Sequence, residues 1–132
     1  MPPGSFIRVL FPTREAPQRP GLLHIGYVLA STANEAMLAC TTSQPWPART
    51  PPPAGARFFD TAEAALLSQS RAFIMRLDIV AKLPLTSIWF PDINQPGHGV
   101  IAVAPPQLQE ELTAIATNLI RRRRELIQMR GV

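Results

Sequence analysis

The chain of 132 residues has one cysteine, and no apolar run approaches the roughly 18 residues that a membrane-spanning helix needs. The single cysteine excludes an internal disulfide and a metal site built from several cysteines. Inside a predicted strand, this residue, Cys40, is typical of a small core hydrophobe. The first residues also lack a basic segment followed by a long apolar stretch. We therefore expect no signal peptide, no membrane association and a cytoplasmic protein.

Common catalytic motifs are also missing. No glycine-rich phosphate loop follows a strand, no two carboxylates are spaced as an acid–base pair, and no cysteine–histidine cluster has metal-ligand spacing. We therefore expect neither a metal nor another cofactor. The chain has fewer acidic than basic residues, with 9 Asp and Glu against 13 Lys and Arg, and its isoelectric point is near 10.6. This balance favours anionic partners, either nucleic acid or an acidic protein.

Proline is abundant, with 15 residues that separate short apolar segments. Because proline cannot donate to a strand ladder and breaks helices, these residues mark the ends of elements. Alternating apolar positions predict six strands, over residues 5–11, 22–30, Glu35–Thr42, 72–83, 86–90 and 98–104. Residues 43–59 hold five prolines and predict an irregular surface loop.

Two helices are predicted beside these strands. Asp60 and Glu63 have the spacing of a capping box, which opens a short helix. After Pro105 the pattern changes to helical spacing, which predicts one amphipathic helix over residues 106–126. Its apolar positions are Leu108, Leu112, Ile115 and Leu119. We expect a single domain over residues 1–132: a small, strongly bent antiparallel sheet or barrel, mainly β, with a short helix and a C-terminal helix.

Arginine and hydroxyl residues flank the second and third predicted strands. Arg19 precedes Pro20, which disfavours helical geometry at the arginine and holds it at the start of strand 22–30. Three hydroxyl residues, at 41–43, end strand Glu35–Thr42. If the two strands form a hairpin, the arginine and the hydroxyls share one end of the sheet. A guanidinium beside a neutral donor suits a phosphate diester.

Each of these residues also has an ordinary structural interpretation. Hydroxyls at a strand end commonly satisfy a turn, and a lone arginine is commonly solvated or ion-paired. His24, inside a strand, is typical of a core or edge histidine. His98 lies between two glycines in a turn, so a two-histidine ribonuclease arrangement stays open. The arginine run at 121–124 is typical of a solvated helix end, with phosphate attraction as a second interpretation.

Three segments resemble the PemK/MazF-type toxins of bacterial toxin–antitoxin systems, in a divergent PemK-like branch. The stretch QRPGLLHIGYVLA is similar to the Arg-Pro motif that opens the second strand of that family. MLACTTSQPW resembles its strand that ends in a threonine or serine. SQSRAFIMRLDIVAKLPLTSIWF resembles a segment that ends in Leu-Pro, a hydroxyl residue and an aromatic. The ordered set covers about residues 4–90.

The resemblance implies an SH3-like barrel that forms a homodimer, binds an acidic antitoxin and cleaves single-stranded RNA without a metal. It implies catalytic roles for Arg19 and Thr42. Other residues at the same end of the sheet are then expected to bind the substrate, namely His24, Thr41, Ser43 and Gln44. Two alternatives stay open on the same fold: a non-enzymatic, CcdB-like inhibitor of DNA gyrase, and a catalytically inactive binding protein.

Overall fold

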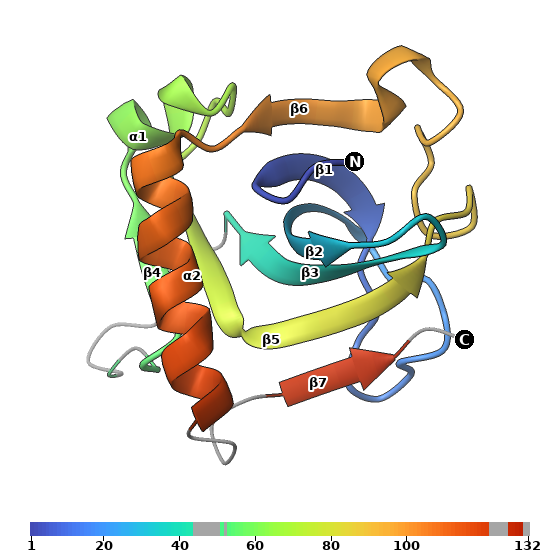
Figure 1. Ribbon diagram of the computed structural model, residues 1–132, viewed down its shortest axis with the longest axis horizontal. Helices are drawn as coiled ribbons and strands as arrows, with labels where there is room; N and C mark the ends of the chain where they lie inside the picture. The colour runs from blue at the N-terminus through green and yellow to red at the C-terminus, as the bar shows by residue number, and fades with distance from the viewer. Residues whose placement is uncertain (44–50, 52, 122–126, 131–132) are drawn as a thin grey trace.

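Six antiparallel strands form a sheet that curls into a half-barrel, and two helices pack beside it (Figure 1). The computed structural model describes residues 1–43, 51, 53–121 and 127–130. The strands are β1 (Ser5–Leu10), β2 (Leu23–Ser31), β3 (Glu35–Thr42), β4 (Ala56–Phe59), β5 (Phe73–Pro84) and β6 (Val100–Val103). Their order across the sheet is β4-β5-β3-β2-β1-β6. The structure confirms the predicted fold class, which is mainly β with added helices.

The first three predicted strands are confirmed, with ends that differ by at most one residue. β1 pairs with β2, and β2 pairs with β3, so the chain makes two consecutive antiparallel hairpins. The strand predicted over residues 98–104 is also present, but it begins at Val100, because residues 96–99 form a short 3-10 turn, η1 (Pro96–Gly99). Two residues of this turn, Gly97 and His98, have φ of 77° and 58°, which a strand cannot accommodate.

A strict alternation of faces, with Phe73, Met75, Leu77 and Ile79 on one side, is the prediction from the sequence for β5, and it is wrong at Ile79. Cys40 pairs with Arg76, but Ala39 pairs with Val80, so the register shifts and β5 bulges between these two pairs. Such extra residues reverse the faces of the strand that follow them. Val80 therefore joins the core cluster of the first half of the strand, and Ile79 packs against the cluster on the other face.

Two core clusters lie on opposite faces of the sheet. One contains Phe6, Tyr27 and Met75 and is covered by the helices. The other includes Trp89 and Phe90, which come from residues 85–93. The strand predicted over residues 86–90 is wrong: this segment folds as turns, in which the backbone N–H groups of Trp89 and Phe90 donate to the Thr86 carbonyl. Its apolar residues pack into the second cluster. A short apolar run in the sequence does not show whether the segment is a strand or a buried turn.

The helices follow their predicted starts. α1 (Thr61–Leu66) begins at the predicted capping box of Asp60 and Glu63, in which each side chain bonds the backbone N–H of the other. α2 (Pro106–Arg121) buries Leu112 and Leu119 against the sheet, as its periodicity predicts. The remainder of the predicted helix, residues 122–126, lies outside the described residues. Among the residues that are described, no helix is long and apolar enough to cross a membrane.

Two short strands were not predicted. β4 lies within the proline-rich stretch 43–59 that was expected to be irregular, and it pairs with the first half of β5. β7 (Ile127–Arg130) pairs with the second half of β5 and runs parallel to it, whereas every pairing among β1–β6 is antiparallel. Both are four residues long, too short to show a period.

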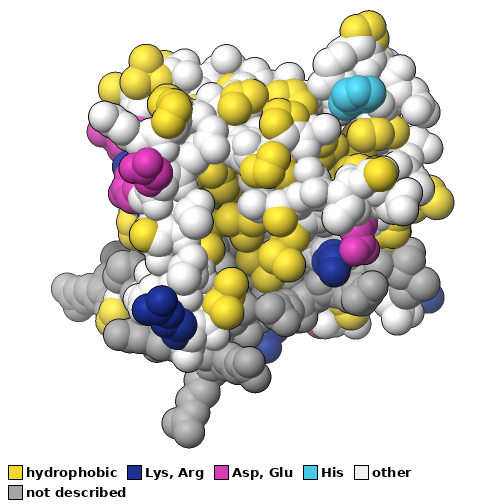
Figure 2. All heavy atoms as spheres, viewed as in Figure 1, with side chains coloured by type: hydrophobic (Ala, Val, Ile, Leu, Met, Phe, Trp, Pro, Cys, Tyr) yellow, Lys and Arg dark blue, Asp and Glu magenta, His cyan; other side chains and the backbone are white. Residues whose placement is uncertain are grey.

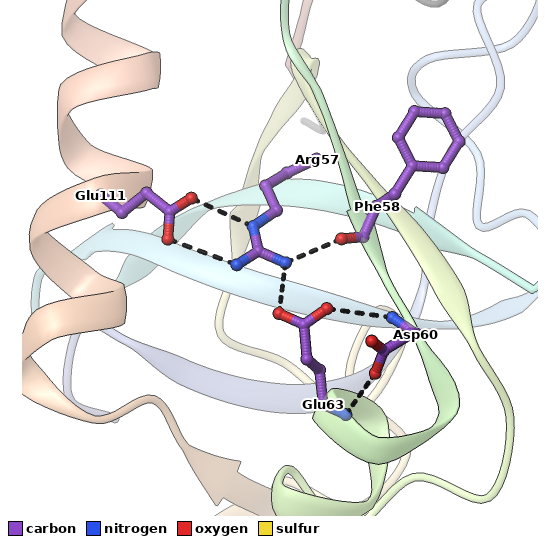
Figure 3. Close-up of polar contacts among 5 residues, drawn as sticks. All are labelled: Arg57, Phe58, Asp60, Glu63 and Glu111. Carbon is purple, nitrogen blue, oxygen red and sulfur yellow. Dashed lines mark hydrogen bonds and ion pairs between the residues drawn. The ribbon is translucent and has the colours of Figure 1, made fainter.

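Arg57 joins β4 to both helices (Figure 3). Its guanidinium donates to Glu63 of α1 at 2.7 Å and to Glu111 of α2 at 3.2 and 3.3 Å. It also lies 4.3 Å from the centre of the Phe59 ring, within reach of a cation–π interaction. The hydrogen bond from Arg57 lowers the pKa of Glu63. This group fixes α1, and with it the turn that leads into β5.

Candidate functional site

An open pocket of about 470 Å³ lies where β2 begins and β3 ends. The pairing of β2 with β3 confirms that the start of one strand and the end of the other share one end of the sheet. β1 and β6 contribute one wall, and the turn before β5 contributes another. The lining residues are Arg8, Leu22, Leu23, His24, Ile25, Thr41, Thr42, Ser43, Gln69, Phe73 and Ile101. Four residues predicted for the site, His24 and the three hydroxyls, are therefore brought together.

The hydroxyl residues of the pocket differ in what surrounds them. Thr41 is buried, and its hydroxyl donates to the Ile25 carbonyl of β2, so that hydroxyl serves the sheet. Thr42 is half-buried and Ser43 is exposed, and both line the pocket. Gln44, which was also predicted to bind substrate, lies outside the described residues. Thr42 and Ser43 are thus the hydroxyls best placed to meet a ligand.

His24 lies at the boundary between this pocket and a smaller one of about 210 Å³. Its Nδ1 lies 3.2 Å from the Thr41 carbonyl oxygen. A carbonyl oxygen only accepts, so this contact requires Nδ1 to donate. The histidine therefore has a structural contact with β3 and also lines both pockets.

The smaller pocket contains the one cysteine, Cys40. Burial raises the pKa of its thiol to about 11, although Arg76 opposes that rise. The thiol is therefore protonated at neutral pH, and a protonated thiol is a poor nucleophile. Cys40 also packs against the second core cluster, as expected for a small core hydrophobe.

Arg8 is the cation that lines the large pocket. It lies on β1 opposite Ile25 of β2, and its side chain is half exposed. Its Nε is 3.8 Å from a carboxylate oxygen of Asp92, a long and partly solvated ion pair. Among the described residues, no acidic side chain lines the pocket. Arg8 is therefore the charged group that an anion in this pocket would meet.

Arg19, the predicted catalytic arginine, does not line this pocket. It is exposed in the turn before β2, where its backbone N–H donates to the Ala16 carbonyl at 3.2 Å. Within the described part of the chain, its guanidinium has no hydrogen bond or ion pair. Three residues later, Leu22 forms part of the pocket wall. The arginine thus belongs to the loop that leads into the pocket.

No protein-family model matches the chain, and no curated protein sequence matches it. Within the described ranges, no three His, Cys, Asp or Glu side chains come together as a candidate metal site.

Sequence reasoning missed Arg8 and Gln69. Alternation along β1 shows that Arg8 faces away from Ile7 and Val9, but it does not show that this side of the strand borders a pocket. Gln69 precedes β5 by four residues in a turn without periodicity. Both enter the pocket through contacts between distant segments, and a local pattern carries no such signal.

Proposed function

We propose that this chain is a PemK/MazF-type toxin with an SH3-like barrel, and that it cleaves single-stranded RNA in the cytoplasm without a metal. The observation that carries this proposal is one pocket lined by Arg8 and two hydroxyl residues, Thr42 and Ser43, and by no acidic side chain of the described residues. A guanidinium and neutral donors are the groups that bind a phosphate diester. The resemblance of three sequence segments supports the same function.

In the proposed reaction, the 2′-hydroxyl of the RNA attacks the adjacent phosphorus, and the bond to the 5′-oxygen breaks. The 2′-hydroxyl loses its proton and the leaving 5′-oxygen gains one, so the products are a 2′,3′-cyclic phosphate and a 5′-hydroxyl. Negative charge builds on the phosphoryl oxygens during the attack. Thr42 orients the phosphate, while Arg8 and Arg19 stabilise that charge from the pocket wall and from the loop before β2.

Substitution of Arg19 and Thr42 tests the assigned roles. We expect Arg19→Ala and Thr42→Ala each to lower the cleavage rate by about a hundredfold, because each removes a donor that acts on the transition state. Arg19→Lys should recover little, since an ammonium group cannot reproduce the planar two-point contact. The measurement is the single-turnover cleavage rate of a long unstructured RNA, with the melting temperature as a check of folding.

Two further variants sharpen this test. Arg8→Ala shows whether the arginine that lines the pocket is also needed. Arg71→Ala is the matched control for Arg8→Ala: Arg71 is exposed and, unlike Arg8, does not line the pocket. Wild-type rates in Arg19→Ala and Thr42→Ala would show that neither residue acts in the reaction. An equal loss of rate in Arg71→Ala would show that general positive charge, rather than the pocket, binds the RNA.

A further inference from the structure

The turn after α1 places Gln69 in the pocket wall. The backbone N–H of Ser68 donates to the Ala65 carbonyl, and that of Gln69 donates to the Ala64 carbonyl. These two bonds form the Schellman motif, which normally has glycine at its left-handed position. Here that position is Ser68, with φ of 60°. The direction of Gln69 is therefore set by a backbone conformation that is unfavourable for serine.

Such a conformation costs about 1 kcal/mol or more for a residue other than glycine. Residues in sparsely populated backbone regions cluster at binding and catalytic sites, where the surrounding structure maintains them. Ser68 itself is exposed, so its side chain does not explain the turn by packing. What the turn does provide is a fixed position for the residue that follows it.

The buried nitrogen of the Gln69 carboxamide has no hydrogen-bond partner among the residues that the structure describes. This atom, Nε2, is shielded from solvent. It is the one such buried side-chain atom among the described residues. Buried polar groups are nearly always bonded, so an exception calls for an explanation. Rotation about the last side-chain bond exchanges the nitrogen and the oxygen, so the carboxamide can offer a ligand either a donor or an acceptor.

Apolar side chains line the same pocket as Gln69. Leu22 and Leu23 are 78% and 46% exposed, although both are large hydrophobic residues. Ile101 and Phe73 continue the apolar lining. An apolar slot with one carboxamide matches the chemistry of an unpaired nucleobase, which has apolar faces and a polar edge. The pocket volume of about 470 Å³ is within the range of small-ligand sites.

We propose that Gln69 reads the nucleobase next to the phosphate held by Arg8 and Thr42, and so determines where the RNA is cut. This inference rests on the proposed ribonuclease function. The base lies against Leu22, Leu23 and Ile101, and its edge bonds the carboxamide. Once the carboxamide turns so that its nitrogen also faces the pocket, it presents a donor beside an acceptor, and Watson–Crick edges carry a complementary pair. Gln69 is thus a specificity residue rather than a catalytic one.

The direct test is the base composition around the cuts in a random-sequence RNA. The wild type should favour one base over another by about tenfold at one flanking position, and Gln69→Leu should largely abolish that preference. Gln69→Glu should move the preference toward guanine, whose N1–H and N2–H₂ groups both donate to a carboxylate. Total cleavage should change by less than about threefold, because the phosphate contacts are intact.

Two controls accompany these variants. Gln107→Leu makes the same chemical change at an exposed glutamine of α2 outside the pocket, and it should leave the preference unaltered. The melting temperature of Gln69→Leu should equal or exceed that of the wild type, because the substitution removes an unbonded buried donor. An unchanged base preference in Gln69→Leu, or an equal change in Gln107→Leu, would overturn the inference.

A binding assay separates this inference from the proposed function. The probes are four 2′-O-methylated RNA hexamers that differ in one central base and cannot undergo 2′-hydroxyl attack. Fluorescence anisotropy should show unequal affinities for the wild type and equal affinities for Gln69→Leu. If the wild type cleaves no RNA but discriminates the hexamers through Gln69, the ribonuclease proposal fails and the inference stands. If the wild type cleaves RNA and Gln69→Leu discriminates the hexamers like the wild type, the ribonuclease proposal stands and the inference about Gln69 fails.

Discussion

Neighbouring threonines at the end of β3 present their hydroxyls to different surroundings. Thr41 is 4% exposed and donates to the Ile25 carbonyl of the adjacent strand. Thr42 is half-buried and lines the pocket. The sequence TTS predicted that hydroxyls would meet at this end of the sheet. The sequence could not show which hydroxyl has a structural role and which meets a ligand, because a backbone carbonyl and a phosphate oxygen both accept a hydrogen bond from a hydroxyl.

Thr41→Val tests the structural role of the first hydroxyl. Valine keeps the shape of threonine but cannot donate to the Ile25 carbonyl, so we expect the free energy of unfolding to fall by about 1 kcal/mol. Urea denaturation measures it. Thr113→Val, at an exposed position of α2, is the control and should change stability by less than about 0.5 kcal/mol. Equal stability of wild type and Thr41→Val would show that the hydroxyl bond contributes nothing.

At the scale of elements, Arg57 links β4, α1 and α2 and so supports the turn that carries Gln69 (Figure 3). We expect Arg57→Ala to lower the free energy of unfolding by about 1–2 kcal/mol at neutral pH, through lost ion pairs and a lost cation–π contact. Arg71→Ala, at an exposed position, is the control.

The pH dependence of this effect follows from Glu63. Its pKa in the folded protein is lowered, chiefly by the hydrogen bond from Arg57, below the ordinary value of 4.5. Its contribution to stability is therefore complete above that value and is lost as the pH falls through the folded-state pKa. The stability difference between wild type and Arg57→Ala should shrink when urea denaturation is repeated near pH 3. A difference that stays constant or grows would contradict the assigned ion pair.

The sequence predicted elements well where a period extends over several residues. β1, β2, β3, the α1 capping box and α2 all follow from local pattern. β4 and β7 did not, because four residues show no period and their pairing with β5 is decided by distant chain segments. The bulge in β5 reversed Ile79 and Val80 for the same reason: register depends on the partner strand.

At the scale of the whole molecule, an apolar surface suggests how copies of the chain associate. Figure 2 shows hydrophobic side chains gathered beside α2, over the middle of the sheet. Partly buried residues that pack on this side of the core are Ile25, Leu29, Met37, Ala102, Leu108 and Ile115. Surfaces of this kind mark interaction sites in many proteins. We propose that the protein is a homodimer and that an acidic antitoxin is its physiological partner.

Light scattering at micromolar concentration tests the dimer. We expect a mass of twice 14.5 kDa. Association of two folded chains is reversible, so the mass should return to that of one chain on dilution. The circular dichroism spectrum should not change, because each chain stays folded. A mass of one chain throughout the micromolar range would refute this assembly.

The site as a whole was only partly predictable. Local pattern placed His24 and the hydroxyl residues at one end of a hairpin, and the structure lines one pocket with them. Arg8 and Gln69 joined them through the curl of the sheet and the turn after α1, which no stretch of sequence specifies by itself. The catalytic role of Arg19 is implied by the resemblance of its Arg-Pro stretch, and it stays a prediction.

We propose that this pocket cleaves RNA by attack of the 2′-hydroxyl. The most direct measurement is incubation of the purified protein with a long unstructured RNA, with and without EDTA, followed by chemical analysis of the new ends. We expect equal cleavage in both conditions, 2′,3′-cyclic phosphate and 5′-hydroxyl ends, and almost no cleavage by the Arg19→Ala/Thr42→Ala double variant. Intact RNA, cleavage abolished by EDTA, or full activity of the folded double variant would contradict the account.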